Sequence, residues 1–152
     1  MTTEVAFHFN APDKLAYACR LLRKAVAQGA RVVVSAPADT LAKLDVMLWT
    51  FSQTDFVAHV RLPMRPAPQA SVDVALAMSP VLLADDAAAP DLPHREVLLH
   101  LGSDMPQGYA DYARVIEVVS LDEQDRQQAR QRWKRYTEQG HTIVRHDLQL
   151  AS

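Results

Sequence analysis

Short apolar runs rich in β-branched residues recur along this chain, and they restrict its fold more than any other feature. The run at 31–36 (RVVVSA) holds three consecutive valines, which is typical of a strand buried on both faces. An alternating run at 4–9 (EVAFHF) precedes it, and an amphipathic helical pattern joins the two, starting near Pro12 and ending at Gly29. Strand, helix and strand in this order predict a parallel sheet with a right-handed crossover.

The rest of the chain contains further elements of the same kinds. Buried strands are expected at 96–101 (EVLLHL) and 114–119 (RVIEVV). Helices are expected at 39–49, where Asp39 is a plausible N-terminal cap, and at 122–139, where Asp122 and Glu123 are favourable at the positive end of the helix. The tail after this last helix is compatible with a short extended piece.

The middle of the chain is the least regular part. The stretch at 50–60 is expected to be loop-like, and the three prolines at 61–71 predict a loop. Two runs, 72–78 and 80–85, compete for a central strand, and we favour the second (PVLLAD). Residues 1–152 are therefore expected to form a single α/β domain, with a mainly parallel, Rossmann-like sheet and helices on both faces.

The composition argues against several classes of protein. A formal net charge of −2 does not supply the surplus of cations that general phosphate binding needs, so no direct sequence-specific nucleic-acid binding is expected. The first residues lack the pattern of a signal peptide, and no apolar stretch is long enough to cross a membrane. Cys19 is the single cysteine, which fits a reducing compartment. We expect a cytoplasmic protein with no membrane partner.

Glycine is scarce, and its placement argues against nucleotide chemistry. None of the four glycines falls in a G-x-G-x-x-G or G-x-x-x-x-G-K-[ST] frame, so no nucleotide-binding glycine loop is expected. There is also no G-x-S-x-G elbow and no histidine pair at zinc spacing. We expect no catalytic residue, no metal and no cofactor. The alternative is a small α/β enzyme or nucleotide-binding regulatory protein that uses strand ends near Ser35 and Asp85.

The last helix gathers cations around an aromatic residue. With about 100° per residue, one stripe covers roughly a third of the helix circumference and holds Arg126, Arg130, Trp133, Lys134 and Thr137. Ala129 and Tyr136 face the core beside it, whereas Arg132 and Arg135 point elsewhere. This stripe suits a ligand with carboxylates and an apolar side chain, such as an acidic peptide C-terminus. The other interpretation is a solvated cationic face on which Trp133 only anchors the core.

A second group of aromatic residues lies at the end of the helix at 39–49. Trp49 ends this helix, and Phe51 and Phe56 follow within a short stretch. Large aromatic residues at such a position often form the centre of a protein interface, although they also pack under loops as an extension of the core.

Taken together, the motifs of this chain resemble the chi subunit family of bacterial DNA polymerase III over nearly its whole length. The motifs that carry the resemblance are V-x-F-H in the first strand, R-V-V-V-S-A with the helix and Gly29 before it, L-D-x-x-L-W at 44–49, F-V-A-H at 56–59, P-V-L-L from Pro80, E-V-L-L-H-L-G from Glu96 and A-R-x-R-W-K-x-Y at 129–136. Their order and spacing are together specific.

The resemblance implies a Rossmann-like accessory subunit of the clamp-loader assembly with no polymerase activity of its own. It implies that one face binds the psi subunit, and through psi the clamp loader, while another binds the acidic, Phe-ending C-terminal tail of single-stranded-DNA-binding protein. Residues carried over for the tail are Arg126, Arg130, Trp133, Lys134 and Val119. Residues carried over for psi are Trp49 and Phe56, and a helicase is a further candidate partner for that face.

Overall fold

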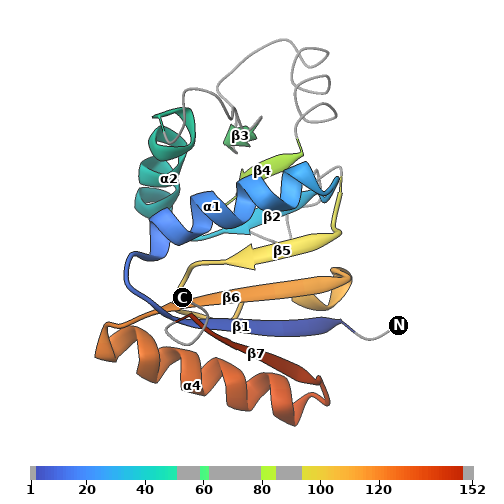
Figure 1. The fold of residues 1–152 in the computed structure, drawn as a ribbon. Helices are drawn as coiled ribbons and strands as arrows, with labels where there is room; N and C mark the ends of the chain where they lie inside the picture. Colours follow the sequence, from blue (N-terminus) through green and yellow to red (C-terminus); the bar gives the residue numbers. More distant parts are fainter. Residues whose placement is uncertain (1–2, 51–58, 62–79, 85–93, 149–152) are drawn as a thin grey trace.

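The computed structural model describes residues 3–50, 59–61, 80–84 and 94–148, which form a parallel sheet flanked by helices (Figure 1). The strands are β1 Glu4–Ala11, β2 Val32–Ser35, β3 His59–Arg61, β4 Val81–Ala84, β5 Val97–His100, β6 Arg114–Ser120 and β7 Ile143–Asp147. The helices of the described part are α1 Lys14–Ala27, α2 Ala38–Thr50, the 3-10 turn η1 Tyr109–Asp111 and α4 Glu123–Glu138.

The strands of the described part form one sheet in the order β3-β4-β2-β5-β6-β1-β7. Each pair of neighbouring strands is parallel, which confirms the predicted sheet. Residues 81–84 form β4 beside β2, so the favoured run at 80–85 is confirmed as a strand. The tail contributes β7, which pairs with β1 at the edge of the sheet.

One expectation for the middle of the chain was wrong. Residues 59–61, expected in loops, form the edge strand β3, which pairs with β4. Three residues (HVR) with one apolar side chain are too few to show a strand pattern, and their strand geometry depends on pairing with β4 rather than on local preference. The competing run at 72–78 lies outside the described residues.

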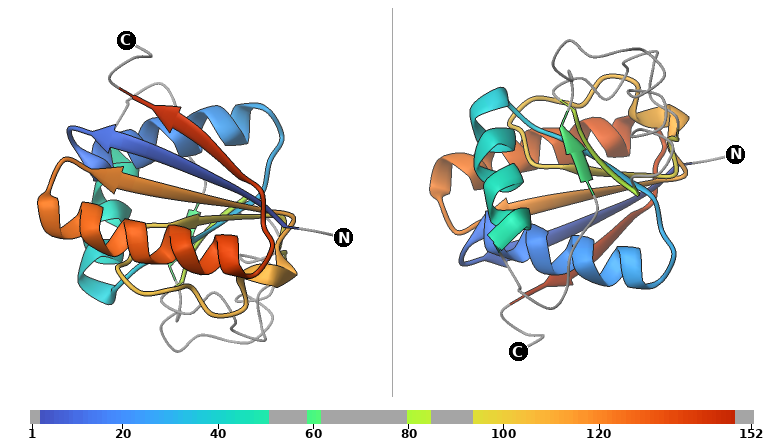
Figure 2. Two further views of the ribbon diagram at one scale, coloured as in Figure 1. Left: turned by 90° about the horizontal axis from the view of Figure 1, so that it is seen from below. Right: turned by 90° about the horizontal axis from the view of Figure 1, so that it is seen from above.

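Helices cover both faces of the sheet, as predicted. Figure 2 shows α1 and α4 on opposite sides of the sheet, and the buried residues of α2 share the core of α1. Leu22, Leu44 and Val34 belong to the core under α1 and α2, whereas Phe7 and Tyr136 belong to the core under α4. Alternation along the buried strands supplies both cores at once, because successive side chains point to opposite faces.

Side-chain caps fix where two of the helices begin. The Asp13 carboxylate accepts a hydrogen bond from the Ala16 amide at 3.1 Å and starts α1, slightly later than Pro12 suggested. The Asp122 carboxylate accepts one from the Asp125 amide at 3.1 Å and starts α4 where the sequence predicts it. The second cap sets the register of the helix that carries the cationic stripe.

Candidate functional site

A cavity of about 430 Å³ opens between α4 and the ends of β1, β6 and β7. We call it the α4 cavity, and its lining residues are Phe7, Phe9, Asn10, Val119, Arg126, Ala129, Arg130, Trp133 and Arg145. Aromatic and aliphatic side chains thus share one hollow with three arginines. Such a combination suits a ligand that has both an apolar group and negative charge.

The apolar wall is held in place by the core. The Trp133 ring lies 5.0 Å from the Phe7 ring, centroid to centroid, at a tilt of 53°. Phe7 is buried, and the half-buried Trp133 packs against the same core cluster as Tyr136. Because both rings are fixed before any ligand arrives, little side-chain entropy would be lost on binding.

The charged side of the cavity comes from two elements. Arg126 and Arg130 stand one turn apart on α4, and Arg145 comes from β7. The Arg145 guanidinium lies 5.7 Å from the centre of the Trp133 ring, a cation–π distance that places positive charge over the apolar wall. Arg130 pairs with Glu123 at 3.5 Å, but both side chains are more than half exposed, so this pair is weak and easily exchanged.

Four of the five residues predicted for the acidic tail are brought together here. Arg126, Arg130, Trp133 and Val119 all line the α4 cavity. Lys134 does not line it and is exposed on the helix beyond Trp133, so any role would be at the rim. As predicted, Ala129 and Tyr136 face the core, and the half-buried Trp133 packs at its border.

Sequence reasoning missed the residues that β1 and β7 contribute. Alternation in the first strand does place Phe7 and Phe9 on one face, which was an available signal. The sequence gives no signal for Arg145, because the position of this residue depends on the pairing of β7 with β1, where Arg145 lies opposite Phe7. The cavity is therefore more apolar and more basic than the helix stripe alone indicates.

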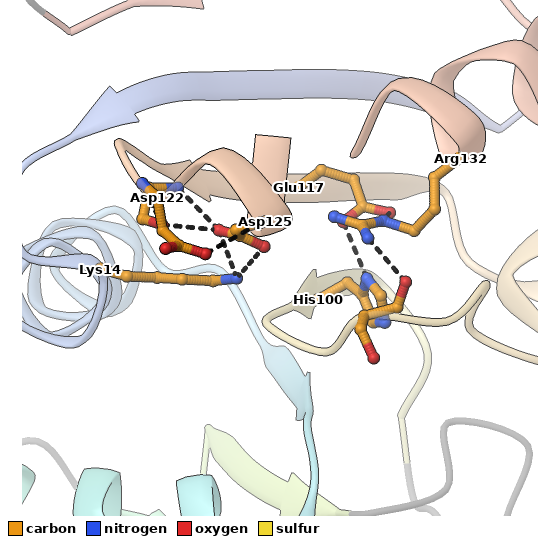
Figure 3. A network of polar contacts seen from close by, with 8 residues as sticks. Lys14, His100, Glu117, Asp122, Asp125 and Arg132 are labelled. Carbon is orange, nitrogen blue, oxygen red and sulfur yellow. Dashed lines mark hydrogen bonds and ion pairs between the residues drawn. The ribbon is translucent and has the colours of Figure 1, made fainter. Parts of the chain in front are cut away.

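A buried polar network fixes the rotation of α4 against the sheet (Figure 3). Glu117 of β6 is fully buried, and its Oε1 lies 2.7 Å from Nδ1 of His100. Its Oε2 accepts hydrogen bonds from Nε of Arg132 at 3.2 Å and from the Tyr136 hydroxyl at 2.8 Å. Arg132, which the helical pattern placed outside the stripe, is therefore the helix's anchor to the sheet.

The ionisation of Glu117 follows from its neighbours. Burial raises its pKa, but the attraction of His100 and Arg132 and the hydrogen bonds from His100 and Tyr136 outweigh burial, so the pKa lies below its ordinary value. Glu117 is thus charged at neutral pH and pairs with the buried Arg132 guanidinium.

The start of α4 is held by a second set of contacts in Figure 3. Asp125 accepts hydrogen bonds from the Ser120 amide at 2.8 Å and from Lys14 Nζ at 3.2 Å. These bonds outweigh the effect of burial and lower the pKa of Asp125. Together the two networks direct the side of α4 that carries Arg126 and Arg130 toward the cavity.

The residues predicted for psi are only partly described. Trp49 lies in the last turn of α2, and its side chain is outside the described part, as is the whole of Phe56. What α2 does show nearby is Val46, an exposed apolar side chain with 62% of its surface accessible. The two psi residues stay a prediction.

The strand ends considered for an enzyme also form a hollow. A cavity of about 390 Å³ lies at the ends of β2 and β5 and is lined in part by Ser35, His100 and Gly102. Asp85 falls outside the described residues, and the described part holds no group of three metal-ligating side chains. Cys19 is fully buried in the core as predicted, and burial raises the pKa of its thiol to about 11, which makes it a poor nucleophile.

None of the described helices has the length and apolar character needed to cross a bilayer.

Comparison with known proteins identifies the family of this chain. The sequence model of the family described as "DNA polymerase III chi subunit, HolC" matches residues 1–144. A curated relative, DNA polymerase III subunit chi of Pseudomonas aeruginosa, is 31% identical over 136 residues, which cover 89% of this chain and 87% of the relative. The chain therefore belongs to the chi subunit family of DNA polymerase III, a family of accessory subunits of that polymerase.

Proposed function

We propose that this chain links the psi subunit, and through it the clamp loader, to the acidic C-terminal tail of single-stranded-DNA-binding protein during DNA replication. The observation that carries the proposal is the α4 cavity, in which an aromatic wall and three arginines lie side by side.

The chemistry of such a tail matches the two halves of the cavity. A terminal Phe would place its ring against Trp133 and Phe7, with Val119 as a further wall. Its α-carboxylate and the acidic side chains before it would pair with Arg126, Arg130 and Arg145, whose planar guanidinium groups bind carboxylates with two parallel hydrogen bonds. A volume of about 430 Å³ falls within the usual range of roughly 300–1,000 Å³ for ligand sites.

The psi subunit is proposed to bind at Trp49 and Phe56. Trp49 belongs to α2, whose buried residues share the core of α1 on the face of the sheet opposite to α4. The α4 cavity and α2 lie on opposite faces of the sheet, so a ligand end held in the cavity and psi bound at α2 would not compete for space. A linking subunit needs this arrangement.

The test is titration of the whole chain with a Phe-ending acidic peptide. Arg130→Ala is expected to weaken binding at least tenfold, because a cavity arginine that pairs with a carboxylate is lost. Lys134→Ala is expected to weaken it less, because Lys134 does not line the cavity. Higher salt should weaken binding to the unmodified chain, since the arginines are exposed.

Arg135→Ala is the matched control for this titration. It removes the same charge from the same helix but lies outside the cavity lining. Equal peptide affinity in the Arg130 and Arg135 variants would show that the cavity is not the tail site. Retention of psi by the Arg130 variant would show that the variant remains folded.

A further inference from the structure

A larger groove of about 960 Å³ lies on the other face of the sheet, between α1 and strands β1, β6 and β7. We call it the α1 groove. Its floor is mainly apolar and includes Leu21 and Ile116. Its charged lining includes Arg20 and Lys24, both exposed on α1, and Arg114 at the start of β6. The proposed function leaves this groove unused.

The α1 groove continues from the α4 cavity around one edge of the sheet. Phe9 and Arg145 line both hollows. β7 is the last strand of the described sheet on this side, so no further described strand lies beyond it (Figure 2). An edge strand also presents backbone hydrogen-bonding groups that an extended peptide can use.

The groove carries the charge that an acidic chain requires. Its charged lining residues are four cations and the carboxylate of Asp147. Asn10 donates a hydrogen bond to this carboxylate at 3.0 Å, which reduces its repulsion of an anion. The lining is therefore complementary to a peptide rich in Asp and Glu.

An unpaired nitrogen in the groove wall points to the same conclusion. His8 is 8% exposed and lines the groove, and its Nδ1 is bonded to the Tyr17 hydroxyl. Its Nε2 is buried and has no hydrogen-bond partner in the described part of the chain. Buried polar atoms in native proteins almost always have a partner, so a hydrogen-bonding group of a ligand, which is an acceptor when Nε2 carries the proton, would complete this wall.

We infer that the α1 groove binds the acidic segment that precedes the C-terminal residues of the same tail, which crosses the edge of β7 beside Arg145. The inference rests on the proposed function and extends it to a second site. The 14 residues of α1 span about 21 Å. An extended peptide rises about 3.3 Å per residue, so roughly six or seven residues upstream of the α4 cavity would follow the length of the helix.

The experiment measures how the affinity of a peptide for the full chain depends on its length and charge. Three tail peptides are titrated: the last four residues ending in Phe, the last twelve with their Asp and Glu, and the same twelve with the upstream Asp and Glu changed to Asn and Gln. The test variant is Arg20→Ala with Lys24→Ala. The control is Arg31→Ala with Lys43→Ala, two exposed cations outside both hollows.

The acidic twelve-residue peptide is expected to bind the unmodified chain about three- to tenfold more tightly than the other two, the range for two solvent-exposed ion pairs. The Arg20/Lys24 variant should lose this advantage, and the Arg31/Lys43 control should keep it. Equal binding of long and short peptides to the unmodified chain, or equal losses in both variants, would overturn the inference.

Failure of the proposed function has a different signature. If the four-residue peptide binds the unmodified chain and the upstream acidic residues add no affinity, the α1 groove is not a binding site for the tail. The proposal for the α4 cavity is then unaffected. If no peptide binds the unmodified chain, or Arg130→Ala leaves the short peptide's affinity unchanged, the proposed function is wrong and the inference falls with it.

Discussion

Replacing Glu117 by Gln is expected to lower the free energy of unfolding by about 3 kcal/mol, the lower end of the range for breaking a buried ion pair. The carboxylate serves three groups, with His100 on Oε1 and both Arg132 and Tyr136 on Oε2. A Gln side chain can keep all three contacts if its amide nitrogen faces His100 and the imidazole changes tautomer. The negative charge is still lost, and Arg132, 2% exposed, keeps its positive charge without a counter-ion.

Equilibrium unfolding in urea at pH 7, followed by circular dichroism, measures this loss. Glu96→Gln makes the same chemical change at an exposed position and is the control. Adding Arg132→Met to the Glu117 variant should recover part of the stability, since it removes the unpaired charge. If Glu117→Gln and Glu96→Gln unfold within about 0.5 kcal/mol of each other, the size of a surface effect, the network does not anchor α4.

The sign of the pH dependence follows from the same contacts. The pKa of Glu117 in the folded chain lies below its ordinary value of 4.5. Its contribution to stability is therefore complete above about pH 4.5 and is lost as the pH falls through the folded-state pKa. The Gln variant should lack this component, so the difference in unfolding free energy between it and the unmodified chain should shrink in acid.

Two further predictions concern other parts of the chain. Trp49→Ala or Phe56→Ala should weaken the complex with psi about 30-fold, the effect of removing an aromatic hot spot, and leave tail binding unchanged; undiminished co-purification with psi would place that face elsewhere. Burial first, then the charges of His146 and Arg114, lower the pKa of His8 from 6.5 to about 4. The contribution of the neutral His8 to the unfolding free energy should therefore be fully present above pH 6.5 and decrease as the pH falls toward 4. His8→Phe should flatten the unfolding free energy over this range, and an unchanged slope would assign it to other groups.

The fold was predictable where burial alone determines a strand. Runs such as RVVVSA remove their apolar side chains from water by forming strands that are covered on both faces. The short links between the elements restrict their order. β3 was not predictable, since its three residues take strand geometry from pairing with β4. Arg145 was missed for the same reason, because a partner strand far away in the sequence decides which hollow it enters.

Helical periodicity predicted only part of the candidate site. It gives the direction of a side chain around the helix axis but not whether that side chain lines the cavity. It correctly grouped Arg126, Arg130 and Trp133, and it included Lys134, which shares the stripe but stays outside the cavity lining. It also separated Arg132 from the stripe without showing that this arginine is buried. That required knowing that β6 places Glu117 beneath the helix, a contact between residues 15 positions apart in sequence.

The two kinds of arginine on α4 explain how a docking helix can be both rigid and accessible. Arg132 is buried against Glu117 and fixes the rotation of the helix, whereas Arg126 and Arg130 stay exposed on the side that this rotation directs to the cavity. A buried ion pair adds little net stability compared with apolar packing, but it accepts few alternative arrangements. We infer that its value here lies in specifying one orientation of α4, because a rotated helix would carry its exposed arginines away from Phe7 and Trp133 would no longer form the wall beside them.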